Sequence, residues 1–327
     1  MKKHQRAIKK IKIAVSKLQL DLSEQTILTE VGSNEYVYIP IIAAIAGAKK
    51  VFAWTRDTQY GLAQDIIKEC QFILTQLDLL NKVDFYVGEF NQTHIEQADI
   101  ITNSGFLRPL DETKLKFSKK GVVIPLMYEK WELRETDVDS VYCKTRNIKL
   151  AGTWENHPDL MVFEHVGPLA IKMALNSGFE VYRNKIIVWS NDHFGEVAEN
   201  AFNKFGATKV VRTTDEKTLL ENADADFIFL CDYDELRNYS NNEVFDVNEL
   251  LKRNKEIGLV HLYGKLDYLK LSESICLVYP KFDGKESIMT HTLSYVGMNP
   301  IIDLQVAGFK VAQLMKEGGE SDILQHV

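Results

Sequence analysis

The stretch Lys185-Ile186-Ile187-Val188-Trp189-Ser190-Asn191-Asp192-His193-Phe194-Gly195 has the pattern of a buried strand, a short loop and the start of a helix. At a shift of 159 residues the pattern recurs, since Ile27 falls on Ile186 and the pair Gly47-Ala48 falls on Gly206-Ala207. The repeat indicates two copies of one strand–loop–helix unit. The alternative is two independent units that look alike because parallel strands are rich in Val and Ile.

Short β-rich runs alternate with helical stretches in both halves, and this alternation is typical of parallel sheets. The predicted strands are 27–31, 50–54, 83–87, 98–102 and 121–127, then 185–190, 209–213, 226–231, 258–263 and 275–279. The pattern predicts the α/β class, with two Rossmann-like parallel-sheet domains.

Two helical segments are expected to connect the domains. The first starts at Asn156-His157-Pro158, has a break at Gly167-Pro168 and stops at Gly178. The second covers 300–312 and returns to the first domain. We therefore expect an N-terminal domain of residues 1–157 plus 299–327, a second domain of 158–298, and two crossing helices around an interdomain cleft.

Composition supports this size and class. A chain of 327 residues suits about two domains, and 45% hydrophobic with 26% charged residues is typical of a globular protein. The cysteines form no C-x-x-C pair and are expected to be reduced core thiols; they are Cys70, Cys143, Cys231 and Cys276. No apolar run reaches the ~20 residues of a membrane span, and the N-terminus lacks the apolar centre of a signal peptide, so we expect a cytoplasmic protein.

Charge is distributed unevenly along the chain. Residues 1–17 contain seven of the 39 Lys and Arg and none of the 46 Asp and Glu, which leaves a formal charge of −14 on the rest. The negative charge of residues 18–327 argues against a nucleic-acid partner, because it would repel the phosphate backbone. The basic segment places Ile8, Ile11, Val15 and Leu18 on one helical stripe. This stripe is expected to lie on the acidic domain itself, with an acidic membrane surface or partner as the alternative.

The second half resembles the two-lobed NAD-binding dehydrogenases, a superfamily that includes D-2-hydroxyacid dehydrogenases, S-adenosylhomocysteine hydrolase and alanine dehydrogenase. The resemblance is carried by 185–195, Gly206-Ala207, Ala225-Asp226, 258–264 and the C-terminal crossing helix. It implies NAD or NADP on the second lobe and hydride transfer to or from a small metabolite in the cleft.

The chain departs from this superfamily at its nucleotide loop. The three glycine slots of G-x-G-x-x-G hold Ser190, Asp192 and Gly195, and a carboxylate at Asp192 would oppose a pyrophosphate. The ribose-binding acid is replaced by Arg212-Thr213-Thr214, where Arg212 could accept a 2′-phosphate. The residues expected to bind the cofactor are Ser190, Asn191, Asp192, His193, Gly195, Arg212, Thr213, Thr214 and Asp232.

The first half has a nucleotide-type loop of its own. The stretches 30–36 and 47–57 resemble the first two motifs of a class I S-adenosylmethionine methyltransferase, with Thr55 where a ribose-binding acid is usual. S-adenosylmethionine is therefore an alternative cofactor, and the absence of any cofactor is another.

Side chains that follow strands supply the candidate site, because ligands of parallel sheets bind beyond the carboxyl ends of the strands. His261 and Lys265 follow one strand, and His291 is the nearest match to the acid/base histidine of the resembled dehydrogenases. The expected substrate-binding residues are Asn103, Ser104, Tyr128, Glu129, Glu155 and His157.

Two other groups of polar residues could form a ligand site. His157 and His165 are eight residues apart, ~12 Å along a helix, which argues against a metal site. The stretch 128–132 carries two carboxylates and two aromatic rings, which could bind a cationic or sugar ligand or form an amphipathic turn.

These patterns favour an NAD(P)-linked oxidoreductase acting on a small metabolite, with His291 or His261 as proton donor. The first alternative is a pseudo-dehydrogenase without cofactor that acts as a binding or scaffold partner in a biosynthetic pathway. The second is a methyltransferase-like use of the first domain. A small molecule is the expected partner, and a homodimer stays open.

Overall fold

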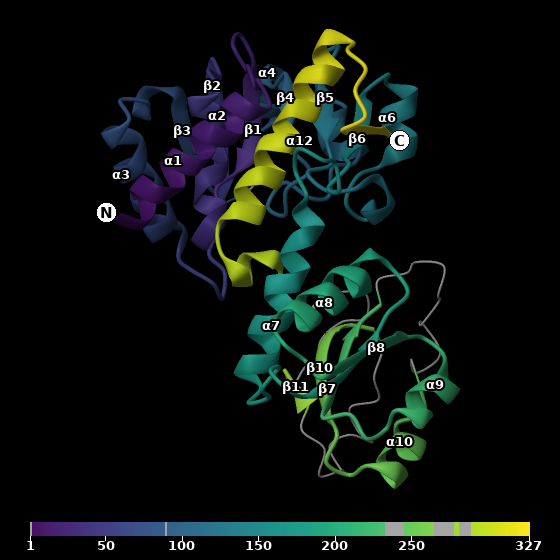
Figure 1. Ribbon diagram of the computed structural model, residues 1–327. Helices are drawn as coiled ribbons and strands as arrows, with labels where there is room; N and C mark the ends of the chain where they lie inside the picture. The colour runs from purple at the N-terminus through teal and green to yellow at the C-terminus, as the bar shows by residue number, and fades with distance from the viewer. Residues whose placement is uncertain (1, 89, 233–244, 265–277, 281–288) are drawn as a thin grey trace. The chain divides into compact units, whose positions relative to one another are not determined.

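The computed structural model describes residues 2–88, 90–232, 245–264, 278–280 and 289–327 (Figure 1). The chain divides into two compact units. Unit 1 comprises Met1–Val162 and Met298–Val327, and unit 2 comprises Phe163–Gly297.

Unit 1 contains a sheet that has seven strands in the described residues, in the order β12-β6-β5-β4-β1-β2-β3. The strands are β1 (Thr26–Glu30), β2 (Lys50–Thr55), β3 (Val83–Val87), β4 (Ile100–Ile101), β5 (Val123–Pro125), β6 (Lys149–Thr153) and β12 (Leu324–His326). All neighbours are parallel except β12, which runs antiparallel to β6. The first six strands therefore follow the doubly wound order 3-2-1-4-5-6, whose order reverses between β1 and β4.

Unit 2 contains a parallel sheet that has five strands in its described part, in the order β11-β10-β9-β7-β8. The strands are β7 (Lys185–Trp189), β8 (Lys209–Thr213), β9 (Phe227–Cys231), β10 (Gly258–Tyr263) and β11 (Val278–Tyr279). Counted within the unit, the order is 2-1-3-4-5, the other common doubly wound order, and it reverses between β7 and β9. The predicted α/β class with two parallel-dominated sheets is confirmed.

The repeat predicted at 159 residues is visible in the hydrogen bonds. The backbone N–H of Lys49 donates to the carbonyl of Gln25 at 2.9 Å, and that of Thr208 donates to the carbonyl of Asn184 at 2.9 Å. Each residue of the second pair is 159 positions after its counterpart, so the turn that leads into the second strand is the same in both units.

An aspartate holds the start of the first strand in both units. The Oδ2 atom of Asp99 accepts from the N–H of Thr26 at 2.9 Å, and that of Asp226 accepts from the N–H of Lys185 at 2.7 Å. Asp99 immediately precedes β4 and Asp226 immediately precedes β9, the strands that lie beside β1 and β7. The matching Ala-Asp pairs of the sequence are therefore equivalent in the fold.

Helices cover both sheets. They are α1 (Lys2–Lys17), α2 (Ile39–Ile45), α3 (Ala63–Gln76), α4 (Gln92–Gln97), α5 (Glu112–Leu115), α6 (Ser140–Thr145) and α12 (Asn299–Glu317) in unit 1, and α7 (Val166–Asn176), α8 (His193–Lys204), α9 (Glu216–Glu221) and α10 (Val247–Arg253) in unit 2. Short 3-10 turns are η1 (Asn34–Tyr38), η2 (Leu80–Lys82), η3 (Lys130–Glu132), η4 (Val162–His165) and η5 (Leu293–Val296). No helix of the described residues is long and apolar enough to cross a membrane.

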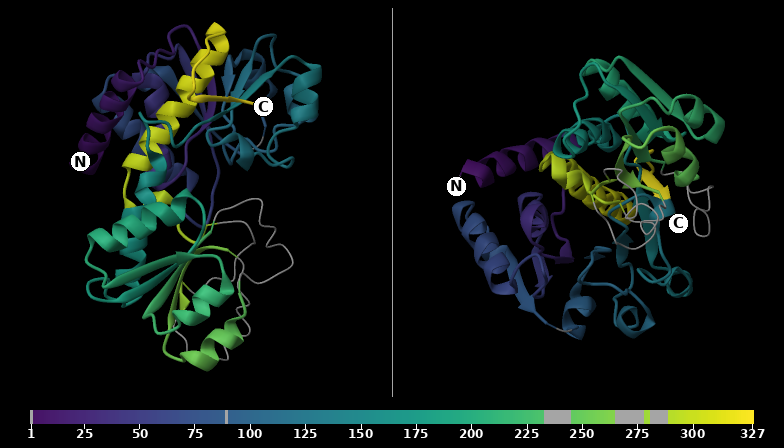
Figure 2. Two further views of the ribbon diagram at one scale, coloured as in Figure 1. Left: turned by 45° about the vertical axis from the view of Figure 1, so that its right-hand side comes forward. Right: turned by 90° about the horizontal axis from the view of Figure 1, so that it is seen from below.

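The basic N-terminal helix α1 packs on α12 and α2 of its own unit (Figure 2). It buries Ala7, Ile11 and Ala14, whereas Ile8 and Val15 are half-buried. The apolar stripe therefore faces the unit's own helices, and the small alanines at its centre let α1 approach them closely.

The structure corrects the prediction of the first connecting helix. Asn156-His157-Pro158 forms a turn, and the helix begins only at Val166. Gly167-Pro168 is not a break, because it lies in the first turn of α7, where a proline leaves no hydrogen bond unmade.

The strand predictions also needed changes. The strands predicted at 98–102 and 121–127 are limited to Ile100–Ile101 and Val123–Pro125, and β6 and β12 were missed. Of the strand predicted at 275–279, the described part is Val278–Tyr279.

Removing the strand-start aspartates tests the repeat. We expect Asp226→Ala to lower the free energy of unfolding by about 0.5–1.5 kcal/mol, because it removes the acceptor of the Lys185 N–H. Asp99→Ala should cost more, since Asp99 also pairs with Lys119 at 2.8 Å. Urea denaturation measures both, with Asp226→Asn, which keeps an acceptor oxygen, as the mild control. Equal stability of Asp226→Ala and the natural protein would contradict the expectation.

Candidate functional site

The loop after β7 is closed by the chain's own side chains. Asp192 is the N-cap of α8, and its Oδ1 atom accepts from the N–H of Gly195 at 3.1 Å and from the Ser190 hydroxyl at 2.6 Å. The Ser190 hydroxyl in turn accepts from the N–H of Asp192 at 3.2 Å. Asp232, at the end of β9, accepts from the N–H of Asn191 at 3.2 Å. The backbone N–H groups of Asn191, Asp192 and Gly195 are therefore already bound within unit 2.

Gly195 is required where the loop meets the strand. A Cβ atom at this position would lie 2.5 Å from the Cβ of Ser190, a distance that real atoms do not reach. Gly195, in the third glycine position of the motif, thus allows α8 to pack closely on the end of β7. The other two positions hold Ser190 and Asp192 instead of glycine.

The end of β8 offers no ribose-binding acid. The Nε atom of Arg212 donates to Glu199 at 2.8 Å, so this guanidinium is engaged on α8. Thr213 is buried, and its hydroxyl accepts from the N–H of Asp215 at 2.9 Å. Thr214, which follows, is half-buried.

A dinucleotide does not fit this loop in the usual pose. The pyrophosphate would need backbone N–H groups at the start of the helix, and Asp192 and Asp232 already accept from those of Gly195 and Asn191. A phosphate at the same place would also meet the Asp192 carboxylate at close range, and like charges repel strongly in a low dielectric. The carboxylates of Asp192 and Asp232 thus occupy N–H groups that could otherwise bind a pyrophosphate.

His261 is buried on β10, and its Nε2–H donates to the carbonyl of Gly264 at 2.6 Å. Burial lowers the pKa of His261 to about 4, against the smaller opposing effect of this hydrogen bond. The ring is therefore neutral at neutral pH and cannot serve there as a cationic proton donor.

The hydroxyl of Thr290 connects His291 to the backbone of His261. The Thr290 hydroxyl donates to the carbonyl of His261 at 2.5 Å and lies 3.3 Å from the Nδ1 atom of His291. The ring of His291 contacts those of Tyr279 and Tyr295, with centroids 5.7 and 4.3 Å away. Burial, and then the charge of Lys172, lower the pKa of His291. Lys265, the third predicted catalytic residue, lies outside the described residues.

In unit 1, the ends of β4 and β5 carry a connected polar network. The Asn103 amide donates to the Tyr128 hydroxyl at 2.6 Å, and this hydroxyl donates to Asp137 at 2.9 Å. Arg108 completes the network, since its Nε donates to Asn103 at 2.8 Å and its Nη1 lies 3.4 Å from Asp137. Burial raises the pKa of Tyr128, so it remains a neutral donor. Ser104 is buried beside this network.

Two glutamates follow β5 and β6. The Oε1 atom of Glu129 accepts from the N–H of Glu155 at 2.9 Å, and its Oε2 atom accepts from the Trp131 indole at 2.9 Å and the Gln325 amide at 3.4 Å. Burial raises the pKa of Glu155 well above its ordinary value, and the negative charges of Glu132 and Glu129 add to the effect. Burial and the neighbouring carboxylates thus favour the neutral, protonated form of Glu155.

Glu30, at the end of β1, is a third buried carboxyl group. It accepts from the N–H of Phe106 at 3.0 Å, and burial raises its pKa against the opposing effects of that bond and of Arg108 and Arg56. The pKa of Tyr36 is raised by its burial and by the charges of Glu30, Glu35 and Glu155, which brings the ends of β1 and β6 into one electrostatic environment.

The remaining predicted residues form local contacts. His157 lies in the turn after β6, where its Nδ1 atom accepts from the N–H of Asp159 at 3.1 Å and its ring packs on Trp154. His193 is flanked by Glu164 and Glu196, at 3.5 and 3.4 Å. The described part of the chain holds no group of three or more His, Cys, Asp or Glu side chains arranged for a metal ion.

Sequence reasoning missed Glu30, Arg108 and Asp137 as members of the unit 1 site. Glu30 is the last residue of β1 and the next-to-last residue of the strand predicted at 27–31, and a charged residue near the end of a buried strand can be recognised in the sequence. Arg108 and Asp137 lie in loops, and nothing in the local pattern marks them as neighbours of Tyr128.

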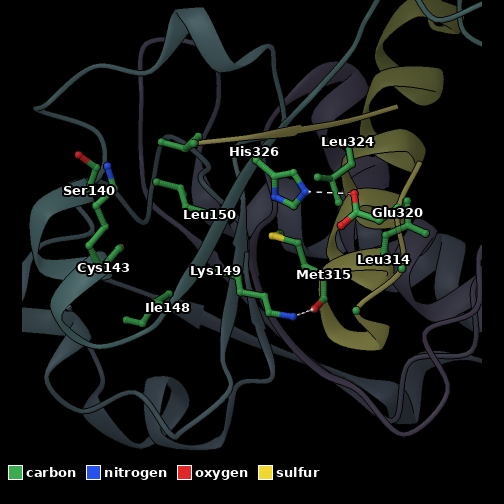
Figure 3. Close-up of a pocket in the computed structure, with 14 residues that line it drawn as sticks. Ser140, Cys143, Ile148, Lys149, Leu150, Leu314, Met315, Glu320, Leu324 and His326 are labelled. Atoms are coloured by element: carbon green, nitrogen blue, oxygen red, sulfur yellow. Dashed lines mark hydrogen bonds and ion pairs between the residues drawn. The ribbon is translucent and has the colours of Figure 1, made fainter. Parts of the chain in front are cut away.

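A separate cavity of about 400 Å³ lies in unit 1 between α6, β6, α12 and β12 (Figure 3). Ile148, Leu150 and Leu314 contribute apolar surface to it. The Lys149 ammonium donates to the carbonyl of Met315 at 2.6 Å beside it. Since Lys149 starts β6, the cavity lies at the amino end of that strand, away from the strand ends described above.

No family model matches the sequence, and no curated protein matches it. Solved structures do match. One of the subunits of dipicolinate synthase from Bacillus halodurans is 12% identical with a TM-score of 0.56, covering 91% of this chain and 98% of that one. A 2-hydroxyacid dehydrogenase from Ketogulonicigenium vulgare is 10% identical with a TM-score of 0.54, covering 92% and 98%. NAD-dependent formate dehydrogenase from Staphylococcus aureus, in complex with NAD, is 11% identical with a TM-score of 0.53, covering 91% and 96%.

These likenesses establish the fold. The chain has the two-domain Rossmann fold of these solved structures, which is the fold that the resemblance seen in the sequence implies. At 10–12% identity they carry no residue's role from those proteins to this one.

The buried His261 predicts a pH dependence of stability. Its pKa falls from 6.5 to about 4 on folding, so the unfolded chain binds the extra proton as the pH drops through this window, and folding weakens. The full effect is about 3 kcal/mol. We expect His261→Gln, which keeps an N–H donor, to remove that share of the acid sensitivity in urea titrations between these pH values. His326→Gln, at an exposed position, is the control. Identical pH profiles for His261→Gln and the natural protein would refute this account.

Proposed function

We propose that this chain binds a small metabolite on a dehydrogenase fold without a dinucleotide at the β7 loop. It would act as a binding or scaffold partner in a biosynthetic pathway. The observation that carries the proposal is the closed loop, in which Asp192 accepts from the N–H of Gly195 at 3.1 Å and Asp232 accepts from that of Asn191 at 3.2 Å. Two of the N–H donors that could bind a phosphate at this loop are therefore already bound to carboxylates.

The proposed ligand site lies at the carboxyl ends of the unit 1 strands. Its side chains are held by one another rather than by solvent, as in the network of Asn103, Tyr128 and Asp137. Such a preorganised set of donors and acceptors favours binding of a small polar molecule, because little side-chain freedom is lost on binding. Asn103, Ser104, Tyr128, Glu129, Glu155 and His157 remain the proposed ligand-binding residues.

An NAD(P)-linked oxidoreductase is the second candidate, and the fold favours it. The matched formate dehydrogenase is in complex with NAD, and the likeness extends over 91% of this chain. His291 and His261 would be its acid/base candidates, although the low pKa of His261 leaves His291 as the better of the two. This candidate requires Asp192 to leave its capping position.

We further propose that the protein works in the cytoplasm. Cys70, Cys143 and Cys231 are buried free thiols in the described residues, which suits a reducing compartment. Burial raises the pKa of Cys143 to about 11, so this thiol is unreactive at neutral pH.

Ligand titrations separate the two candidates. We expect NAD⁺, NADPH and S-adenosylmethionine at millimolar concentration to leave the melting temperature of the natural protein unchanged, because ligands stabilise only what they bind. A rise of several degrees with NAD⁺ or NADPH would overturn the proposal in favour of the oxidoreductase, and a rise with S-adenosylmethionine would favour the methyltransferase-like alternative.

Removing the Asp192 carboxylate tests whether it is what prevents a dinucleotide from binding at the β7 loop. Asp192→Gly should lose about 1 kcal/mol of stability with the helix cap and should bind NAD⁺ measurably in isothermal titration calorimetry. Asp215→Gly is the matched control, because Asp215 caps α9 in the same unit, where its Oδ2 atom accepts from the N–H of Thr218 at 2.9 Å. If neither variant gains affinity, the Asp192 carboxylate is not the obstacle to the dinucleotide.

A further inference from the structure

Glu129 and Glu155 are two carboxyl groups that are more than nine-tenths buried, with 6% and 7% of their surfaces exposed. They follow neighbouring parallel strands, β5 and β6, and the N–H of Glu155 donates to Glu129 at 2.9 Å. Native proteins seldom bury carboxylates unless a cation pairs with them, because an unpaired charge is costly to desolvate.

No described lysine or arginine forms an ion pair with Glu129. Its oxygens accept from the Glu155 backbone, the Trp131 indole and the Gln325 amide, and all three donors are uncharged. These bonds hold the carboxylate in place but leave its charge without a counterion.

The Glu155 carboxyl group has fewer hydrogen-bond partners than that of Glu129. It makes no hydrogen bond to any residue that the structure describes. The charged groups that face it are Glu129 and Glu132, both negative, and the phenol of Tyr36 is its other titratable neighbour. Burial and the two negative charges raise the pKa of Glu155 and so favour its neutral, protonated form.

We propose that the carboxyl groups of Glu155, Glu129 and Glu132 bind the protonated amine of a small organic ligand. This inference rests on the proposed function, because it names the ligand class of the unit 1 site. An ammonium group carries three N–H donors and one positive charge, which would give Glu155 hydrogen-bond donors, and Glu129 and Glu155 a counterion, that the described residues do not supply. The half-exposed ring of Trp131 adds an aromatic face, and such faces attract organic cations.

Binding of the amine changes the protonation of the site. The ammonium charge makes the carboxylate form of Glu155 favourable, so its proton passes to the buffer as the ligand enters. We therefore expect protons to be released to the buffer as the amine binds.

Isothermal titration calorimetry in buffers of different ionisation enthalpy measures both the affinity and the proton release. The probes are methylammonium, putrescine and lysine, with 1,4-butanediol as the uncharged analogue of putrescine. We expect at least one amine to bind and butanediol not to bind. E155Q should weaken binding of that amine at least tenfold and abolish proton release.

E135Q is the matched control, because Glu135 is exposed and lies three residues beyond Glu132. It should bind the amine and release the proton like the natural protein. If E155Q fails to fold, E132Q and proton release by the natural protein still decide the question.

Three outcomes would overturn the inference: no amine binds at about 10 mM, a level weaker than any metabolite affinity of interest; E155Q binds the amine unchanged; or Mg²⁺ alone binds with the same proton release. The dinucleotide titrations report on the β7 loop of unit 2. Their outcome is therefore separate, and either proposal can fail while the other stands.

Discussion

A buried polar group must find a partner, and this requirement explains the strand ends of both units. At the β7 loop the backbone N–H groups of Asn191 and Gly195 find carboxylates of the same chain. In the glycine-rich version of such a loop those donors are left for a phosphate. The fold is thus compatible with two solutions, an internal anion or a bound one, and this chain has the internal anion.

The two sheets show how a repeated unit acquires two different strand orders. The turns into β2 and β8 and the aspartates that hold β1 and β7 are equivalent at the level of single hydrogen bonds. Unit 1 then inserts β3 outside β2, whereas in the described part of unit 2 β8 is the edge strand. Both orders still reverse next to the first strand, so in both units the loop after that strand lies at the place where ligands of parallel sheets bind.

The sequence predicted the elements whose pattern is local. The strands at 27–31, 50–54, 83–87 and 209–213 agree with the structure within one residue at each end, because a run of buried β-branched residues bounded by loops has few other interpretations. β12 could not be predicted in this way. Leu324–His326 becomes a strand only by pairing with β6, which is distant from it in the sequence. The same limit applies to the site. The sequence indicated that Asp192 would oppose a phosphate. It did not indicate Asp232, which lies 40 positions further along the chain and reaches the N–H of Asn191 in the same loop only in the folded structure.

The carboxyl groups of the two units illustrate opposite consequences of burial. Asp232 is fully buried, and its Oδ1 atom accepts from the backbone N–H of Asn191. Glu155 is buried beside Glu129 and Glu132 and receives no such donor from the described residues, so its pKa is raised and the neutral, protonated form is favoured. A proton is the smallest cation that a protein can place there, and a larger one can replace it only if that cation brings hydrogen-bond donors for the same oxygens. The protonation of Glu155 is therefore a consequence of what the site lacks, and it indicates the chemistry of whatever completes it.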